Sequence, residues 1–246
     1  MKTILIFYFL LLVSVYSDAQ TRITGGGAAA RILPIKEGVT SYVNGRSGYM
    51  IEGVEIEGSP FFNEQWSKGI VSFKNGKVVD RVPLQLSVYD GQLYYNVNGV
   101  ANIFLDSIAS VKFLADDTLT GHNRVFEVIP VVLDKELFNT FVEVLADGHV
   151  RLLKFEKKII ESYQDMNRAM HQRFKTVDEY YLVVDGAPLK KIKLSKESLF
   201  KALGPYEKKA QKLLESATAK LKSESSFVEF INRINQESQP SSPKAF

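Results

Sequence analysis

The sequence contains no cysteine and only three histidines, and each scarcity removes a class of chemistry. Without cysteine the chain has no disulfides, thiolate metal ligands, cysteine nucleophiles or amino-terminal lipid attachment. His149 and His171 have no second histidine or acidic residue at the i, i+4 spacing of a metal site. The net charge of +3 is too small to indicate a nucleic-acid partner. The sequence therefore predicts no cofactor, no metal and no nucleic acid.

Residues 1–19 have the composition of a secretory signal peptide. Lys2 supplies the positive start, residues 4–15 are almost entirely apolar, and Ser17 and Ala19 place small residues before the expected cleavage site. About a dozen apolar residues fall short of the roughly 20 that span a bilayer, so we expect cleavage rather than a retained anchor. No later stretch approaches spanning length. A cysteine-free exported chain fits a bacterial periplasm or cell surface better than an animal secretory route.

The rest of the chain is predicted to form one folded unit between two unstructured ends. Residues 20–31 hold three glycines and three alanines in two runs and lack an apolar period, which predicts a flexible leader. Residues 32–235 are predicted to form a single β-rich domain whose C-terminal part, 195–235, is helical. A domain boundary near residue 120 is the alternative. Residues 236–246 contain two prolines and are predicted to be a disordered tail.

Alternating apolar and polar side chains predict antiparallel strands, most clearly over residues 82–88 and 93–97. Five Asn-Gly or Asp-Gly pairs permit the positive φ that hairpin turns require: Asn75-Gly76, Asp90-Gly91, Asn98-Gly99, Asp147-Gly148 and Asp185-Gly186. Residues 156–178 are long, polar and only weakly periodic. Because compact domains seldom carry so long a bare loop, this segment is expected to include a short helix or to form a flap over one face.

The last fifth of the chain has the spacing of amphipathic helices. Ser195 is placed to cap a short helix, and Pro205 to open a second one with apolar residues on one face. Ser226 and Glu229 have the spacing of a capping box ahead of a third helix. Amphipathic helices need an apolar surface to cover, and the nearest is the sheet. The sequence therefore predicts an α+β fold, predominantly an antiparallel β-meander, partly closed as a barrel or sandwich-like, with the C-terminal helices packed on it.

Few residues carry catalytic chemistry. Asp116, Asp117 and His122 share a polar loop and have the side chains of a metal site or an acid–base pair. Aspartate, asparagine and glycine in such a loop are also typical of turn geometry, which is the interpretation we favour. The sequence predicts no catalytic residue and no enzymatic activity.

Two groups of side chains are candidates for a ligand or partner surface. The first is aromatic and belongs to the predicted sheet, where it would line a groove or fill the core: Phe61, Phe62, Trp66, Tyr94 and Tyr95. The second belongs to residues 187–222, where ten lysines stand against three glutamates. A lysine-rich amphipathic helix suits an anionic membrane or an acidic partner, and it is also the ordinary solvated face of a packed helix. Among these lysines, the candidates for a ligand or partner surface are Lys208, Lys209 and Lys212.

Several short patterns occur in a characteristic order: Gly58-Ser59-Pro60-Phe61, Trp66, Gly69, Val71, Asn75-Gly76-Lys77, Phe141, Leu145, Gly148 and Tyr180-Tyr181. This order resembles that of a group of exported proteins of unknown function from Gram-negative bacteria, over most of the mature chain. The resemblance implies export and a β-rich fold. It brings no catalytic residue to transfer.

Three functions are weighed on this basis. The first hypothesis is an exported, non-enzymatic binding or scaffold protein of the periplasm or cell surface, whose partner is a protein, glycan or lipid of the cell envelope. The second is a periplasmic carrier of a lipid or another apolar ligand, which requires an unfilled apolar pocket. The third is a hydrolase, which requires a nucleophile or an acid pair gathered by the fold.

Overall fold

The computed structural model describes residues 41–43, 46–51, 54–115, 121–133, 136–216 and 221–237. The predicted signal peptide, the predicted leader, Asp116 and Asp117 lie outside these residues, as do residues 238–246 of the predicted tail. Side chains are described from residue 54 onward, apart from those of residues 131–133 and 136–139.

Within the described residues, thirteen strands form one large sheet, and the predicted α+β class is confirmed. The strands are β1 (Ser41–Val43), β2 (Arg46–Ile51), β3 (Val54–Glu57), β4 (Ser67–Phe73), β5 (Val78–Ser87), β6 (Gln92–Val97), β7 (Val100–Ile103), β8 (Ile108–Phe113), β9 (Arg124–Leu133), β10 (Glu136–Ala146), β11 (Val150–Gln164), β12 (Met170–Val184) and β13 (Lys190–Ile192). Their order is β1-β2-β3-β12-β11-β10-β9-β8-β4-β5-β6-β7, with β13 also on β12. The pairing is antiparallel except between β3 and β12. The predicted partial closure is not found in the described residues, because β1 and β7 are the two ends of the strand order and do not pair with each other.

Alternation and turn residues explain most of these strands. In β4 the residues at odd positions from Ser67 to Phe73 are buried, and those between them are exposed or half-buried. The β6–β7 turn uses Asn98 and Gly99, with φ of 53° and 82°. Both angles lie in the left-handed region that a tight hairpin turn needs and that Asn-Gly supplies at low cost.

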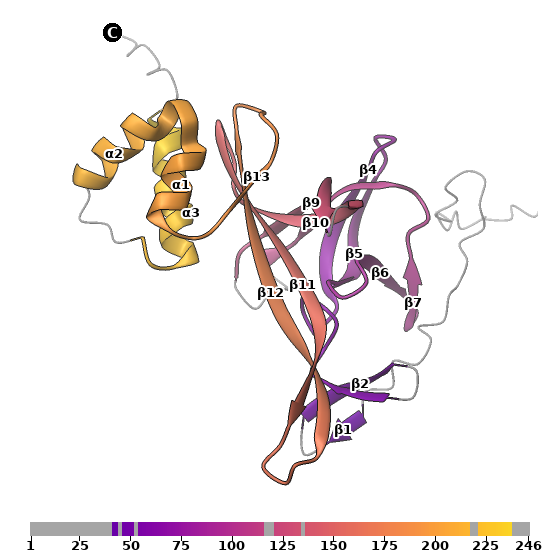
Figure 1. Ribbon diagram of the computed structural model, residues 1–246. Helices are drawn as coiled ribbons and strands as arrows, with labels where there is room; N and C mark the ends of the chain where they lie inside the picture. Colours follow the sequence, from indigo (N-terminus) through magenta and orange to yellow (C-terminus); the bar gives the residue numbers. More distant parts are fainter. Residues whose placement is uncertain are drawn as a thin grey trace, which may run out of the picture.

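The segment 156–178, predicted to contain a helix or form a flap, is instead part of the longest hairpin. The register of β11 and β12 runs without a break from Val150 opposite Val184 to Gln164 opposite Met170. The hairpin extends away from the helices and reaches β1 and β2 at its far end (Figure 1). Its far half lacks an apolar period because cross-strand ion pairs replace apolar contacts. Glu161, for example, accepts hydrogen bonds from Arg173 (2.7 Å) and Lys175 (2.5 Å).

The helices form one group at the other end of the hairpin (Figure 1). They are α1 (Lys196–Leu203), the 3-10 turn η2 (Gly204–Tyr206), α2 (Glu207–Ser216) and α3 (Glu224–Gln236). Ser195 caps α1 as predicted, because its hydroxyl accepts the Ser198 N–H at 3.2 Å. The predicted capping box of α3 is wrong. Ser223 and Ser226 form it, and Glu229 instead pairs with Arg233.

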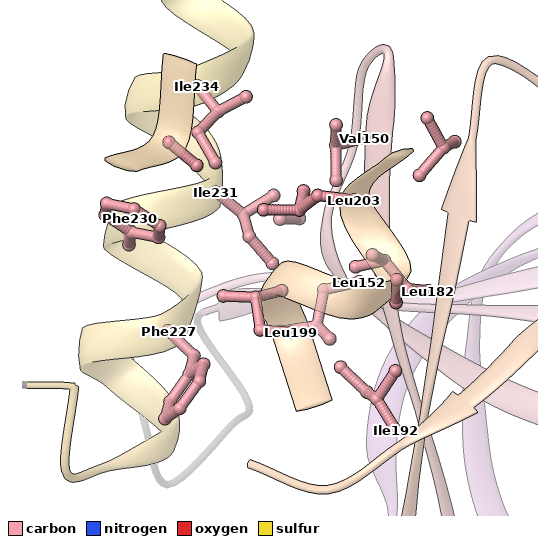
Figure 2. Close-up of a cluster of buried hydrophobic side chains, with 14 of the residues drawn as sticks. Val150, Leu152, Leu182, Ile192, Leu199, Leu203, Phe227, Phe230, Ile231 and Ile234 are labelled. Carbon is pink, nitrogen blue, oxygen red and sulfur yellow. The ribbon is translucent and has the colours of Figure 1, made fainter. Parts of the chain in front are cut away.

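The helices and the sheet share an apolar cluster that we call the helix cluster. Leu199 and Leu203 of α1 and Phe227, Phe230, Ile231 and Ile234 of α3 pack against Val150, Leu152, Leu182 and Ile192 of the strands (Figure 2). A second core, the sheet core, lies over β4, β5, β6, β8 and β9 and includes Leu84, Leu86, Val111, Phe113 and Phe126. A third, smaller cluster includes Val142, Leu153 and Tyr181.

Asn235 fastens α3 to the β10–β11 turn. Its side chain is buried, and Oδ1 accepts the Val150 N–H at 2.8 Å. Nδ2 donates to the carbonyls of Asp147 (3.1 Å) and Val150 (2.8 Å). Gly148 makes this close approach possible, since a Cβ there would lie 2.6 Å from the Asn235 side chain.

Candidate functional site

A cleft of about 560 Å³ lies where the β5–β6 hairpin meets β10 and β11, and we call it the hairpin cleft. Its β5–β6 wall runs from Leu86 to Gln92, and its opposite wall is formed by Thr140 and Phe141 of β10 and by Phe155 to Ile160 of β11. The lining combines apolar side chains with carboxylates, lysines, hydroxyls and one tyrosine.

Lys158 holds the walls of the cleft together. Its backbone N–H donates to the Val88 carbonyl at 3.0 Å, which joins β11 to the end of β5. Its ammonium donates to the carbonyls of Ser59 (2.7 Å) and Phe61. The chain before β4 is in turn bonded to β5, where Phe62 N–H donates to Leu86 O at 2.8 Å. The cleft is therefore a fixed junction of three segments.

A row of charged side chains continues from the cleft to α3, and we call it the charged belt: Arg124, Glu143, Lys154, Glu156, Lys158, Asp178 and Glu224. Along a strand, alternate side chains share one face. Lys154, Glu156 and Lys158 of β11 thus follow Val150 and Leu152 on the face that the helices cover further along.

Most of the belt is paired. Lys154 Nζ lies 3.1 Å from Asp178 Oδ2 and 3.2 Å from Glu224 Oε2. Glu143 is buried and accepts two hydrogen bonds from Arg124, whose guanidinium also lies 4.1 Å from the centre of the Phe62 ring. Burial alone would lower the pKa of Lys154, but the hydrogen bond to Asp178 and the charges of Glu224 and Asp178 outweigh it and raise that pKa.

Glu156 is the exception within the described residues. Its side chain is 15% exposed, its nearest cation is Lys154 Nζ at 3.8 Å, and no donor of the described chain reaches it at hydrogen-bond distance. Burial raises its pKa above the ordinary 4.5, and Asp178 adds to this against the opposing charges of Lys154, Lys158 and Arg124. Burial likewise lowers the pKa of Lys158, against the attraction of Glu156 and Glu64.

Aromatic and acidic side chains stand at the mouth of the cleft. Tyr89 is 41% exposed and packs edge to face on Phe174 of β12, with ring centres 5.4 Å apart. Asp90 accepts a hydrogen bond from the Tyr94 hydroxyl at 3.2 Å. Burial first, and then the charge of Asp90, raises the pKa of Tyr94 to about 12. The mouth therefore presents an exposed aromatic face beside a carboxylate.

The predicted aromatic group lies beside this cleft but does not line it. Phe61 is buried against Tyr94, Phe62 packs on Phe126 with ring centres 5.0 Å apart, and Tyr95 stacks near Phe104. Trp66 is half-buried just before β4. Four of these five side chains thus make aromatic contacts in or near the sheet core rather than lining an open groove.

The predicted lysine group lies on α2, remote from the cleft (Figure 1). Lys208 and Lys212 are exposed, and Lys209 is half-buried. Only Ala210 of α2 is fully buried, while Leu213 and Leu214 pack partly against the helix cluster. The fold does not bring the lysines together with the aromatic group.

His122 and His149 occupy exposed turn positions, and His171 is a half-buried residue near the start of β12. His122 follows Gly121 at the start of β9 and is exposed, while Asp116 and Asp117 lie outside the described residues. His149 Nδ1 lies 2.9 Å from Asp185 Oδ1, which also accepts from the Tyr206 hydroxyl at 3.0 Å. Across the part of the chain that the structure describes, no group of three or more histidine, cysteine, aspartate or glutamate side chains has the geometry to hold a metal ion. In the same part, no helix has the length and apolar character needed to cross a membrane.

Sequence reasoning missed Glu156, Lys158 and Tyr89. A signal was present, because β11 begins with buried Val150 and Leu152 and then places Lys154, Glu156 and Lys158 at the same alternate positions. Charges on a strand face that begins as core indicate a polar site within that face.

Comparison of the chain with protein-family models, with curated proteins and with solved structures finds no match.

Proposed function

We propose that the chain is an exported, non-enzymatic binding protein of the periplasm or cell surface, and that the hairpin cleft is its ligand site. The observation that carries this proposal is the cleft itself, about 560 Å³ with both apolar and polar walls. Small-molecule sites typically measure about 300–1,000 Å³ and combine apolar walls with a few placed polar groups. The cleft meets both criteria.

The polar groups of the cleft support binding rather than catalysis. The Lys158 ammonium is already engaged by two backbone carbonyls and is not placed to act as a base. The Ser87 hydroxyl accepts the Asp90 N–H within the β5–β6 turn, at 3.4 Å. A nucleophile needs a base within hydrogen-bond reach, and the groups around these side chains serve the backbone instead.

A carrier of an apolar ligand is the second candidate. The half-buried Phe141 and Ile160 give the cleft a partly apolar wall, which suits the body of a lipid or a similar molecule. The polar remainder of the lining favours a ligand that has a polar group as well. Carriage and binding differ in whether the ligand is released to an acceptor, so both share the same first test.

The test is native mass spectrometry of the protein purified from its own host, in four versions. We expect the wild type to carry a bound mass that is lost on denaturation. Ile160→Trp places an indole in the cleft and Gln92→Trp places one at its exposed rim, so both should lose the mass. Val97→Trp changes an exposed residue of β6 outside the cleft and should keep it. A bare wild type, or bound mass in both cleft variants, overturns the proposal.

A further inference from the structure

The geometry points to an amphiphilic cation as the ligand of the hairpin cleft: an alkyl body that ends in a primary ammonium group, which donates hydrogen bonds to Glu156. This inference rests on the proposed function and names the chemical class of the ligand. Three observations carry it, namely the hydrogen bonding of Glu156, the charge of the belt and the apolar wall beside them.

The carboxylate of Glu156 lacks the donors that its neighbours have. Within the described belt, Glu143 accepts two hydrogen bonds from Arg124, and Glu224 accepts the Tyr180 hydroxyl at 2.6 Å. Asp178 has Lys154 at 3.1 Å. The Glu156 side chain is 15% exposed, more than Glu143 (8%) but less than Asp178 (33%) and Glu224 (37%), yet its nearest cation is 3.8 Å away. A carboxylate that is mostly covered and has no protein donor is less favourable than an exposed one, so a ligand donor placed there gains more than one placed at an exposed carboxylate.

The cations already present are not free to supply that donor. Lys154 lies between Asp178 and Glu224, both closer to its ammonium than Glu156 is. Lys158 directs its ammonium to Ser59 O and Phe61 O. Lys157 also lines the cleft, but its ammonium is 3.7 Å from Glu179, on the other face of the hairpin from Glu156. None of these three ammonium groups therefore donates a hydrogen bond to Glu156, which leaves its carboxylate able to accept one from a ligand.

The charge of the belt selects a cation over a neutral donor. The belt as defined contains three cations, Arg124, Lys154 and Lys158, and four carboxylates, Glu143, Glu156, Asp178 and Glu224. The surplus is one negative charge when all of these groups are ionised, and water screens it less at Glu156, which is 15% exposed, than at a fully exposed side chain. One bound ammonium would balance it. Asp90 adds a further negative charge at the entrance of the cleft.

The apolar walls of the cleft indicate the chemistry of the rest of the ligand. Phe141 and Ile160 are half-buried and offer apolar surface within the same cleft, whereas Leu86 and Val88 line it as buried members of the sheet core. Tyr89 presents an exposed ring at the mouth, and aromatic faces attract ammonium groups as well as alkyl chains. An alkyl ammonium satisfies the carboxylate and the apolar wall together, whereas a sugar or an alkyl carboxylate satisfies one of them only.

The experiment compares three probes with the same alkyl chain: decylammonium, decanol and decanoate, each titrated by NMR into the full-length mature protein below its micelle concentration. Decylammonium is expected to bind about tenfold more tightly than decanol, as one hydrogen bond to a buried charge implies. Decanoate is expected to bind most weakly. The affinity for decylammonium should rise with pH as Glu156 ionises, while that for decanol stays level.

Two variants of one strand isolate the carboxylate. Glu156→Gln should reduce the affinity for decylammonium about tenfold and leave that for decanol within about twofold. Glu161→Gln is the control, because its carboxylate is on the same strand but already holds Arg173 and Lys175. Binding of decanol or decanoate as tight as that of decylammonium, or an unchanged affinity in Glu156→Gln, overturns this inference and leaves the cleft as a binding site. If none of the probes shifts cleft resonances and native spectra show no bound mass, the proposed function itself fails.

Discussion

Glu156 and Glu161 lie five residues apart on β11 and experience opposite environments. Burial raises the pKa of Glu156 above its ordinary value. Hydrogen bonds from Lys175 and then from Arg173 lower the pKa of Glu161, whose side chain is only partly covered. Because a shifted pKa makes stability depend on pH, these two residues should contribute slopes of opposite sign.

We predict that Glu156→Gln gains stability relative to the wild type as the pH rises. The folded pKa of Glu156 is raised, so its favourable contribution is present below pH 4.5 and is lost as the pH rises through the folded value. The glutamine of the variant does not ionise and has no such loss. Urea unfolding at several values between about pH 4 and pH 8 measures this difference.

The comparison variant is Glu161→Gln. Its folded pKa is lowered, so the stability that the carboxylate contributes is present above its ordinary pKa and lost as the pH falls. Relative to the wild type, Glu161→Gln should therefore lose stability as the pH rises. If the stability of both variants relative to the wild type changes with pH in the same direction, the environments assigned to Glu156 and Glu161 are contradicted.

At the scale of elements, the attachment of α3 depends on the amide of Asn235. Asn235→Ala removes three hydrogen bonds and leaves the Val150 N–H buried, so we expect a loss of about 2–3 kcal/mol in the free energy of unfolding. Denaturant unfolding measures it. Asn232→Ala, one turn earlier on α3 and half-buried, should change stability by less than about 0.5 kcal/mol.

Gly148→Ala tests the same attachment from the other side. Alone it should destabilise, because its methyl would overlap the Asn235 side chain and because its φ of 143° disfavours a side chain. Combined with Asn235→Ala, the overlap disappears, so the double variant should lose less than the sum of the two single losses. Full additivity would show that the two residues do not meet.

Local patterns predicted the elements whose residues act on near neighbours. Ser195 caps α1, and Asn98-Gly99 makes its hairpin turn, because both depend on chain positions close in sequence. The far half of β11 and β12 was not predicted, since its cross-strand ion pairs leave no apolar period to detect. The capping box of α3 was placed three residues late, because Ser223 and Ser226 both suit the role and only the start of the helix decides between them.

Local sequence patterns could not predict the cleft for a different reason. Glu156, Tyr89 and Phe141 belong to three segments whose proximity depends on sheet order, and the hydrogen bond from Lys158 to Val88 sets the junction. The aromatic group, by contrast, lies close to the cleft because Phe61 shares a bridge with Ser87 at its edge. The aromatic composition therefore indicated a part of the sheet next to the cleft, but not the residues that line the cleft.

At the scale of the whole molecule, β10, β11 and β12 couple the helices to the sheet. These strands carry the helix cluster on one face and the third cluster, with Val142, Leu153 and Tyr181, on the other. The helices therefore have no core that is separate from the strands. A destabilising change confined to α1 should therefore lower the stability of the entire fold.

We predict that Leu199→Ala, at a fully buried position of α1, lowers the free energy of unfolding by about 3 kcal/mol. Far-UV circular dichroism follows the helices, and fluorescence of the single Trp66 follows the sheet near β4. Both midpoints should shift together. If the helix signal alone moves, the helices unfold independently of the sheet.

The parallel contact of β3 with β12 has a consequence for the order in which the chain can fold. Ile56 pairs with Gln172 and Glu57 with Arg173, so a strand from the first third of the sequence rests on one from the last third. The meander β1–β3 can pair locally as soon as it is made. Its place in the sheet exists only after β12 has been synthesised and paired. Until then β3 presents an unpaired edge, which makes the nascent chain most prone to mispairing before its final third has emerged.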